Sequence, residues 1–436
     1  MGCTGVVLTS PDTTLNASQQ VVSDLDHELL LKGVPTLKHV ILIGSNKNTI
    51  QNAHLYDDLI KQGDLEETEQ QTIFDEYQSL ADPNSLLSIF LTSGSIDEPK
   101  AVLLTNFDVL NNIVSIWNHF GSLCERCCAP QSMSHVSSGI WCALLPSFKK
   151  STVIVPALIT DAESAIRSIH EEKCTFLIGS PTFLRKILAH PDRHKYNLTS
   201  LRYIATGSTP IQAQFLHDVE AKLGIDRVGQ IYGMTETGPL TDTFHCDDKR
   251  RYTSVGQCMP FVEIKIVDRE DRIVPIGSVG EISARSRFMM RGYHEDLQKT
   301  TETISDDGWF RTGDMGTMDE DGYLYFTGRK KEIIIRAGMN IWPIEIEQAI
   351  QKHTSVAEAY VFPIPDPMED EKVCAFVKPN VGMQCEVEEL KAFLGTILSA
   401  YKMPAHIHIV DDFIRNSIGK VSKSKLADQM IEILDK

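Results

Sequence analysis

Hydroxyl-bearing side chains, a glycine and a lysine follow an apolar run at residues 88–91 (SIFL), which predicts a short buried strand. In order, the loop reads Thr92, Ser93, Gly94, Ser95, Ile96, Asp97, Glu98, Pro99, Lys100. Backbone N–H groups and a lysine ammonium on a loop after a strand can both face a polyphosphate. The Walker A spacing G-x-x-x-x-G-K-[ST] is absent, so this is not a P-loop. On its own, such a Ser/Gly loop is also typical of an ordinary turn.

Two further segments place carboxylates where a nucleotide could bind. The run 232–237 (YGMTET) follows an apolar run, and its Glu236 carboxylate and Thr235 hydroxyl could hold Mg²⁺ and phosphate oxygens. The alternative is a polar loop with a helix cap. In 309–314 (WFRTGD), Asp314 could accept hydrogen bonds from a ribose diol, or it could cap a turn.

Basic residues cluster in three later segments. These are 328–332 (GRKKE), 336–340 (RAGMN) and 416–420 (NSIGK). The last segment ends in Lys420, on a late loop where a lysine is usually a solvated charge. Each of these motifs is weak evidence taken singly, and their order along the chain matters more.

Alternating strands and helices must carry the first of these loops. Short apolar runs indicate strands, and stretches of helical periodicity stand between them. Strands are expected at 38–43, 88–91, 152–156, 175–178, 201–205 and 228–232, and helices at 106–120, 161–173 and 210–223. The spacing Thr160-x-x-Glu163 predicts a capping box at the start of the second helix. This alternation predicts a parallel α/β sheet.

The pattern changes after about residue 255. Closely spaced strand-like runs at 262–268, 279–284 and 323–327 predict a small β-rich lobe. Beyond residue 332 we expect an α+β domain, in which Pro343 opens a helix. Its expected elements are helices 343–353, 386–400 and 423–434 and strands 356–362 and 372–378. The predicted domains are therefore 1–254, an incomplete α/β lobe; 255–331, β-rich; and 332–436, α+β.

Composition narrows the class of protein. The chain has 436 residues, too many for one hydrophobic core. Lys and Arg number 42 against 59 Asp and Glu, which gives a net charge of −17 and disfavours a nucleic-acid partner. The longer apolar stretches, such as 152–159 (TVIVPALI), fall well short of a membrane span. The sequence gives no indication of oligomeric state.

Cysteine usage and the first residues bear on compartment. Ten cysteines in a long chain do not suggest a disulfide scaffold. The cluster Cys124, Cys127 and Cys128 could bind zinc with His135 or Cys142 as fourth ligand, or it could be a set of reduced thiols. The first basic residue is Lys32, so residues 1–31 carry no basic targeting pattern. We therefore expect an intracellular protein, cytoplasmic by default.

Taken together and in order, the five motifs resemble those of the acyl-adenylate-forming superfamily. The resemblance covers residues 92 to 420, and the segments 336–347 (RAGMNIWPIEIE) and 196–210 are most similar to medium-chain acyl-CoA synthetases. It implies a large N-terminal lobe of parallel-sheet α/β subdomains with a small β-rich lobe, then a mobile α+β C-terminal domain. It also implies a ligase that converts a fatty acid to acyl-AMP with Mg²⁺ and ATP and transfers the acyl group to coenzyme A.

The resemblance assigns roles to residues around the nucleotide. The loop residues Thr92, Ser93, Gly94, Ser95 and Lys100 would cradle the β- and γ-phosphates. Thr235 would contact the α-phosphate and Glu236 would bind Mg²⁺. Asp314, assisted by Arg329, would hold the ribose, and adenine would lie between Tyr232 and the turn Gly207, Ser208.

Four further roles follow from the same resemblance. His135 would line the acyl pocket. Lys420 would bridge the substrate carboxylate and the α-phosphate, where an ammonium offsets charge as two anions approach. Lys331 would be the hinge about which the C-terminal domain rotates, and Gly338 would face the site in the thioester step.

Two departures from the family pattern favour a weaker enzyme. The family loop usually reads S-G-T-T-G-x-P-K-G, whereas Ile96, Asp97 and Ala101 replace a Thr and two Gly residues here. A carboxylate about 5 Å from a phosphate charge costs roughly 3 kcal/mol at an effective dielectric near 20. Family members usually carry a longer stretch of chain ahead of this loop than the present sequence does. We therefore expect an incomplete N-terminal lobe with an open strand edge. Any mitochondrial presequence would lie in the missing stretch.

Two alternatives to the synthetase stay open from the sequence. One is a catalytically weak or inactive relative that acts by binding a partner, which the altered loop favours. The other keeps the adenylation step but passes the acyl group to a carrier-protein thiol. Only 16 residues of this sequence follow Lys420, and no carrier domain is visible among them, so we rank this alternative lower.

Overall fold

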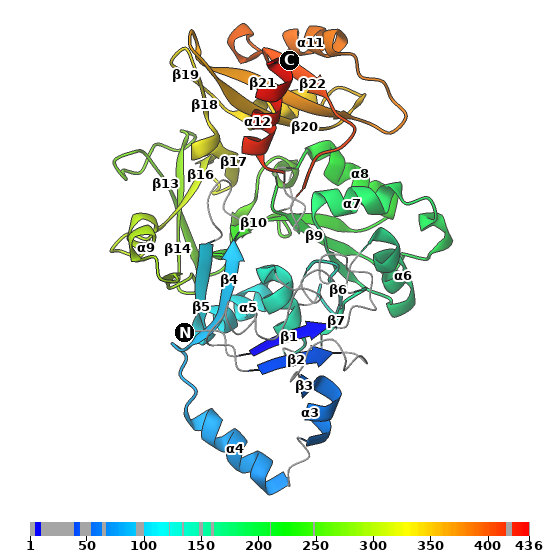
Figure 1. Ribbon diagram of the computed structural model, residues 1–436, viewed down its shortest axis with the longest axis vertical. Coiled ribbons are helices and arrows are strands. Elements are labelled where there is room, and N and C mark those ends of the chain that lie inside the picture. Colours follow the sequence, from blue (N-terminus) through cyan, green and yellow to red (C-terminus); the bar gives the residue numbers. More distant parts are fainter. Residues whose placement is uncertain are drawn as a thin grey trace. The chain divides into compact units, whose positions relative to one another are not determined.

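The structure is a computed structural model, which separates into two compact units, residues 1–82 and 83–436 (Figure 1). The described residues are 5–9, 39–43, 54–62, 67–92, 100–121, 123–132, 135–147, 151–157, 161–209, 211–246, 249–415 and 421–435.

The described residues of the first unit form a small parallel sheet and two helices. Its strands are β1 (Gly5–Thr9), β2 (His39–Ile43) and β3 (His54–Leu55), and β2 pairs in parallel with both of the others. Its helices are α3 (Tyr56–Gln62) and α4 (Glu67–Ser79). Strand β2 confirms the strand predicted at 38–43.

The second unit is built around a sheet with strand order β12-β11-β10-β9-β8-β6-β7. Pairing is parallel from β7 to β10 and antiparallel beyond it, which confirms the predicted parallel α/β sheet. In chain order the strands are β6 (Arg126–Cys128), β7 (Thr152–Ile154), β8 (Phe176–Ile178), β9 (Tyr203–Gly207), β10 (Arg227–Met234), β11 (Gly238–Asp242) and β12 (Gln257–Cys258).

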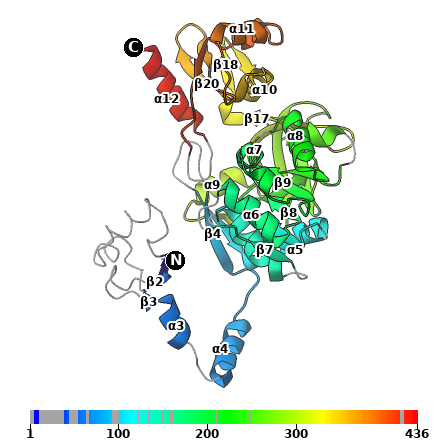
Figure 2. The same cartoon turned by 90° about the vertical axis from the view of Figure 1, so that its right-hand side faces the viewer.

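Helices α6 (Ala162–Glu172), α7 (Pro181–Ala189) and α8 (Ala213–Leu223) pack against this sheet (Figures 1 and 2). Their apolar faces share one core with Leu177 and Ile204 of the strands. The predicted cap of α6 was wrong by one residue. Asp161, which has extended backbone angles, accepts a hydrogen bond from the backbone N–H of Ser164 at 2.7 Å and so begins the helix.

A second, three-stranded sheet carries the predicted phosphate loop. It has the order β15-β5-β4, with β4 (Leu86–Thr92), β5 (Lys100–Thr105) and β15 (Gly292–Tyr293). Helix α5 (Asn106–Phe120) follows β5 and matches the predicted helix at both ends. The prediction that 88–91 is buried was wrong, since Ile89 is 41% and Leu91 69% exposed. Strand β4 is the edge of its sheet and pairs only with β5 among the described residues.

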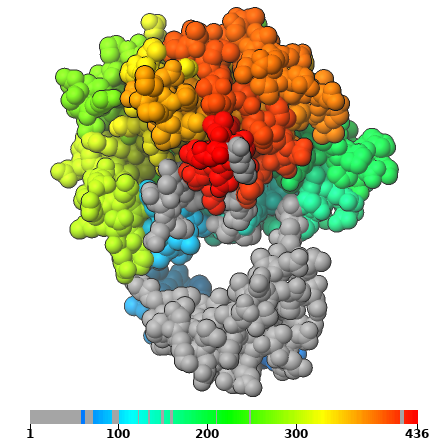
Figure 3. Space-filling view, turned by 45° about the horizontal axis from the view of Figure 1, so that its top comes forward, coloured from blue at the N-terminus to red at the C-terminus, as the bar shows by residue number. Residues whose placement is uncertain are grey.

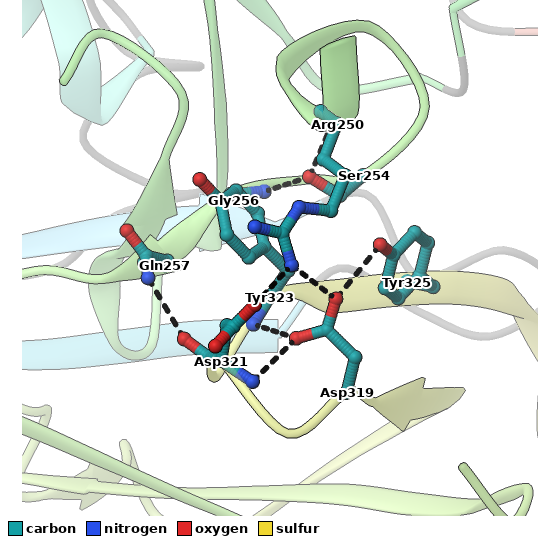
Figure 4. Close-up of polar contacts among 8 residues, drawn as sticks. All are labelled: Arg250, Ser254, Gly256, Gln257, Asp319, Asp321, Tyr323 and Tyr325. Carbon is teal, nitrogen blue, oxygen red and sulfur yellow. Dashed lines mark hydrogen bonds and ion pairs between the residues drawn. The ribbon is translucent and has the colours of Figure 1, made fainter. Parts of the chain in front are cut away.

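The β-rich part is a four-stranded antiparallel sheet of order β13-β14-β16-β17. Its strands are β13 (Val262–Val267), β14 (Gly280–Ser286), β16 (Phe310–Met318) and β17 (Leu324–Arg329), and the short helix α9 (Leu297–Thr303) precedes β16. The turn between β16 and β17 is held by Arg250, which pairs with Asp319 at 3.2 Å and Asp321 at 2.7 Å (Figure 4).

The C-terminal part, coloured yellow to red in Figure 3, is the expected α+β region. Its sheet has the order β19-β18-β21-β20, with β22 added beside β21. The elements are β18 (Ile334–Arg336), β19 (Met339–Ile341), α10 (Pro343–Ile350), β20 (Val356–Asp366), β21 (Asp370–Pro379), α11 (Val387–Gly395), β22 (His406–Ile409) and α12 (Lys423–Leu434). Pro343 opens α10 as predicted, and Ile346, Ala349 and Ile350 lie in the core.

The predicted domain boundaries at 254 and 331 stay a prediction. Within the described ranges, none of the helices has the length and apolar character needed to cross a bilayer. The compartment expected from the sequence likewise stays a prediction.

Candidate active site

The carboxyl ends of β9 and β10 bring together the residues predicted to flank adenine. Gly207 pairs with Ile231 across the parallel strands, one residue before Tyr232. A Cβ atom on Gly207 would lie 2.3 Å from the Ile231 carbonyl oxygen, so only glycine fits there. Ser208 follows with φ of 71°, a left-handed conformation that a non-glycine residue adopts rarely. The structure therefore places Gly207, Ser208 and Tyr232 at one edge of the sheet.

Asp314 lies beside the same edge, although it is 82 residues from Tyr232 along the chain. Tyr232 donates a hydrogen bond from its hydroxyl to Asp314 Oδ2 at 3.0 Å. Arg329, opposite Asp314 in the β16–β17 ladder, places its Nε 3.4 Å from Oδ1. Asp314 is only 4% exposed, and a buried carboxylate needs such partners. The carboxylate oxygens of Asp314 can also accept hydrogen bonds from a diol.

The electrostatics of this pair favour a protonated tyrosine. Burial and then the negative charge of Asp314 raise the pKa of Tyr232 well above its ordinary value. The phenol therefore stays a hydrogen-bond donor to the carboxylate at neutral pH.

Local backbone geometry fixes where Asp314 lies. Gly313 has φ of 71°, and its backbone N–H donates to Glu281 Oε1 at 3.3 Å. Thr312 donates from its hydroxyl to the Ile282 carbonyl at 2.7 Å and accepts from the Asp314 N–H at 3.1 Å. Glu281 is buried and pairs with Lys330 at 2.7 Å. The sequence reasoning missed Glu281, which no motif contains.

A second cluster surrounds Glu236, in the turn after β10. Tyr293 donates from its hydroxyl to Glu236 Oε1 at 3.1 Å, and the Met290 backbone N–H donates to the Glu236 carbonyl at 2.8 Å. The Lys100 ammonium lies 5.3 Å from the centre of the Tyr293 ring. The structure thus brings Lys100 and Glu236 to the same tyrosine. Thr235, also predicted, is partly buried in the same turn.

The two ends of the predicted phosphate loop face each other across a hairpin. Thr92 is the register partner of Lys100, and its hydroxyl donates to the Lys100 carbonyl at 3.4 Å. Ser93, Gly94 and Ser95 lie outside the described residues, as do Ile96 and Asp97. Their predicted effects on ATP binding stay predictions.

His135 stands ahead of a short π-helix, Ser137–Cys142. Its Nδ1 contacts the Ser137 hydroxyl at 2.7 Å, and that hydroxyl donates to Gln131 Oε1 at 2.6 Å. Short π-helical segments are frequent at functional sites. The ring is partly buried, and its assignment to an acyl pocket stays a prediction.

Lys331 and Gly338, which are predicted to act through movement of the C-terminal domain, lie in turns between strands. Lys331 is in the 3-10 turn Lys330–Glu332 between β17 and β18, and its side chain is exposed. Ala337 and Gly338, with φ of 47° and 75°, form the exposed turn of the β18–β19 hairpin. The hinge and thioester roles remain expectations from the resemblance.

Lys420 lies outside the described residues, but the positions around it are held by ion pairs. Arg415 pairs with Glu358 of β20 at 2.6 Å. Lys423 at the start of α12 pairs with Glu347 at 2.8 Å and Glu332 at 3.0 Å. Burial lowers the pKa of Lys423, but these two carboxylates outweigh it and raise the pKa overall.

The cysteines of the predicted cluster are free thiols. Cys124, Cys127, Cys128 and Cys142 are all buried, and burial raises the pKa of Cys124 to about 12. Among the described residues no group of three His, Cys, Asp or Glu side chains is placed to hold a metal ion. His135, named with Cys142 as a candidate fourth zinc ligand, contacts Ser137 instead.

Comparison with known proteins gives the family. The family model described as "AMP-binding enzyme" matches residues 2–294, and "AMP-binding enzyme C-terminal domain" matches 345–420. "Putative acyl-CoA synthetase YngI" of Bacillus subtilis (strain 168) is 32% identical over 405 residues, which are 92% of this chain and 73% of that protein. "Medium-chain acyl-CoA ligase ACSF2, mitochondrial" of Danio rerio is 32% identical over 402 residues, 91% of this chain and 65% of that protein.

A solved structure agrees in fold. It is the ATP-bound RpMatB-BxBclM chimera B1, with a TM-score of 0.75 and 28% identity over 81% of this chain and 70% of that chain. The first family model alone spans more than half of the sequence. The chain therefore belongs to the AMP-binding enzymes, in a family whose members include acyl-CoA synthetases and ligases.

Proposed function

We propose that this protein is an ATP-dependent acyl-CoA synthetase for a fatty acid of medium chain length. In the first half-reaction a carboxylate oxygen attacks the α-phosphorus of ATP, forming acyl-AMP and releasing pyrophosphate. In the second, the coenzyme A thiol attacks the acyl carbonyl carbon, loses its proton and displaces AMP.

The single observation that carries the proposal is the setting of Asp314. A buried carboxylate is costly unless it is paired, and Tyr232 and Arg329 contact the two oxygens of Asp314 beside the sheet edge that carries Gly207 and Ser208. The adenine base would lie beside the turn formed by Gly207 and Ser208, and the ribose diol would donate hydrogen bonds to Asp314. Adenosine recognition needs a surface for the base and an acceptor for the ribose together, and the residues that would supply them come from four separate stretches of chain.

The phosphates would lie on the Glu236 side of the same strand. Tyr232 and Glu236 are four residues apart across the end of β10, so nucleoside and phosphate groups would lie next to each other. Lys100 supplies a positive charge and Glu236 an oxygen ligand of the type Mg²⁺ prefers. Bound Mg²⁺ would offset charge on the phosphate oxygens. Thr92, Ser93, Gly94, Ser95 and Thr235 would add donors to those oxygens.

Lys420 would act at the reacting centre. An ammonium between the substrate carboxylate and the α-phosphate offsets their repulsion, and losing such a group typically lowers the rate ~10²–10³-fold. The ion pairs of Arg415 and Lys423 support this assignment, since they fix the chain at both sides of that segment.

Medium-chain specificity and coenzyme A as the acceptor rest on the relatives. The Danio rerio protein is described as a medium-chain acyl-CoA ligase. His135, Lys331 and Gly338 would serve the acyl pocket, the hinge and the thioester step. A carrier-protein thiol as acceptor and a weakly active relative are the competing outcomes, and the altered loop residues Ile96 and Asp97 favour the latter.

The test is identification of products by mass spectrometry. The purified chain is incubated with Mg-ATP and saturated acids of increasing chain length, with and without coenzyme A. We expect acyl-AMP without coenzyme A, acyl-CoA with it, and the highest yield at medium chain length. Acyl-AMP that never becomes acyl-CoA would exclude coenzyme A as the acceptor. If neither product forms, the variant carrying Ile96→Thr and Asp97→Gly tests whether the loop alone prevents adenylation.

A further inference from the structure

Tyr293 occupies a central place between two side chains that the proposed function uses. It is the second residue of β15 and pairs with Val102 of β5. Its hydroxyl donates to Glu236 Oε1 at 3.1 Å, and the face of its ring lies 5.3 Å from the Lys100 ammonium. None of the sequence motifs contains Tyr293. One buried side chain thus contacts both the candidate metal ligand and the candidate phosphate ligand.

Backbone contacts on both sides hold this tyrosine in place. Its N–H donates to the Thr300 hydroxyl at 2.9 Å, and the His294 N–H donates to the Ala101 carbonyl at 2.8 Å. Gly292 has φ of 151°, and a Cβ there would lie 2.8 Å from the Thr300 side chain. The ring position is therefore set by strand pairing and by α9, independently of any ligand.

The Glu236 turn is held by the same segment through its backbone. The Met290 N–H donates to the Glu236 carbonyl at 2.8 Å. A donor on Oε1 restricts rotation of the carboxylate and so fixes the orientation of Oε2.

We propose that Tyr293 is a positioning residue that orients the Glu236 carboxylate toward the divalent cation of the nucleotide and keeps the Lys100 ammonium beside the phosphates. This inference rests on the proposed function. Partners that orient a metal ligand change metal affinity by about 10–100-fold when removed. A lysine over an aromatic ring gains a further, weaker attraction. The hydroxyl and the ring therefore have separable effects.

The test compares Tyr293→Phe, which removes only the hydroxyl, with Tyr325→Phe. Tyr325 is a matched control, because its hydroxyl also donates to a carboxylate, Asp319 Oδ2, at 3.0 Å, in the turn cluster of Figure 4. Thermal unfolding measures any general loss of stability in both variants. Mn²⁺ serves as the probe, and electron paramagnetic resonance measures its dissociation constant in the presence of a non-hydrolysable ATP analogue.

We expect Tyr293→Phe to raise the Mn²⁺ dissociation constant by about tenfold. Affinity for the analogue without divalent cation should be unchanged, because the ring beside Lys100 remains. Tyr325→Phe should bind Mn²⁺ like the unmodified protein. In a Glu236→Gln background, Tyr293→Phe should have no additional effect on Mn²⁺ affinity, because the tyrosine acts through that carboxylate.

Three results would overturn parts of this account in distinguishable ways. Equal Mn²⁺ affinity in Tyr293→Phe and the unmodified protein would refute the role of Tyr293 and leave the proposed function standing. If Tyr293→Phe lowers Mn²⁺ affinity in the Glu236→Gln background as much as it does alone, Tyr293 does not act through the Glu236 carboxylate. Failure of the unmodified protein to bind Mn²⁺ with the analogue would refute both the positioning role and the proposed function.

Discussion

At the scale of single residues, the chemistry depends on carboxylates whose oxygens are contacted by neighbouring side chains. Tyr232 and Arg329 contact the two oxygens of Asp314, and Tyr293 contacts one oxygen of Glu236. A buried carboxylate without such partners would be costly. The motifs named Asp314, Glu236, Tyr232 and Arg329 but not Tyr293, because nothing in a linear sequence shows that a strand 57 residues away returns to the same turn.

Asp314→Asn should weaken nucleotide binding. The amide keeps the shape of the side chain, but it loses the charge and one acceptor for a ribose diol. Hydrogen bonds to charged groups contribute about 1.5–3 kcal/mol, so we expect the KM for ATP to rise about 10–100-fold. Steady-state kinetics with varied ATP measures it.

The matched control for that variant is Asp268→Asn. This carboxylate pairs with Arg272 at 2.8 Å just after β13, outside the proposed site. We expect its KM for ATP to stay within twofold of the unmodified protein. An unchanged KM in Asp314→Asn would remove Asp314 from nucleotide binding.

At the scale of elements, the periodic spacing of apolar residues predicted the bounds of helices better than the short motifs predicted the strands that carry them. Helices α5 and α12 match their predicted bounds, because amphipathic patterns of twelve or more residues leave little ambiguity. Strand β16 was not predicted, although it contains Asp314, because its residues include two glycines and no regular apolar alternation. Helix α11 ends at Gly395 rather than at residue 400 as predicted.

The β16–β17 turn offers a test of how an element is stabilised. Asp319 accepts from the Tyr323 N–H at 2.9 Å and from the Tyr325 hydroxyl at 3.0 Å, and it pairs with Arg250 (Figure 4). Burial alone would raise its pKa, but these donors outweigh it and lower the pKa below the ordinary 3.8. Asp319→Asn should therefore lower the free energy of unfolding at pH 7 by about 1–3 kcal/mol.

The sign of the pH dependence follows from the lowered pKa. Stabilisation by ionised Asp319 is complete above 3.8, the value of an unperturbed aspartate, and is lost as pH falls through the lower folded-state pKa. The difference in the free energy of unfolding between Asp319→Asn and the unmodified protein should therefore disappear as the pH falls below 3.8. Denaturant unfolding at several pH values measures this difference.

Asp321→Asn is the control, because it removes a more exposed partner of Arg250, and it should change the free energy of unfolding by less than about 1 kcal/mol. Equal losses in both variants at pH 7 would contradict this account.

At the scale of the whole molecule, the candidate site depends on contacts between distant parts of the chain. The predicted parallel sheet is present and carries Gly207, Ser208 and Tyr232 at one edge. The β-rich sheet adds Asp314 and Arg329, and the three-stranded sheet adds Lys100 and Tyr293. The sequence predicted most of these elements, whereas their convergence could be inferred only from the family resemblance, because local patterns carry no information on which sheets meet.

Acyl-adenylate formation is tested by measuring pyrophosphate release by the purified chain with Mg-ATP, with and without a medium-chain fatty acid. Lys420→Ala is the matched variant, since it should retain nucleotide binding and lose the acid-dependent rate by about 10²–10³-fold. We predict acid-dependent release that increases when coenzyme A is added. Absence of acid-dependent release from folded protein that binds ATP, or an equal rate in Lys420→Ala, would contradict the account.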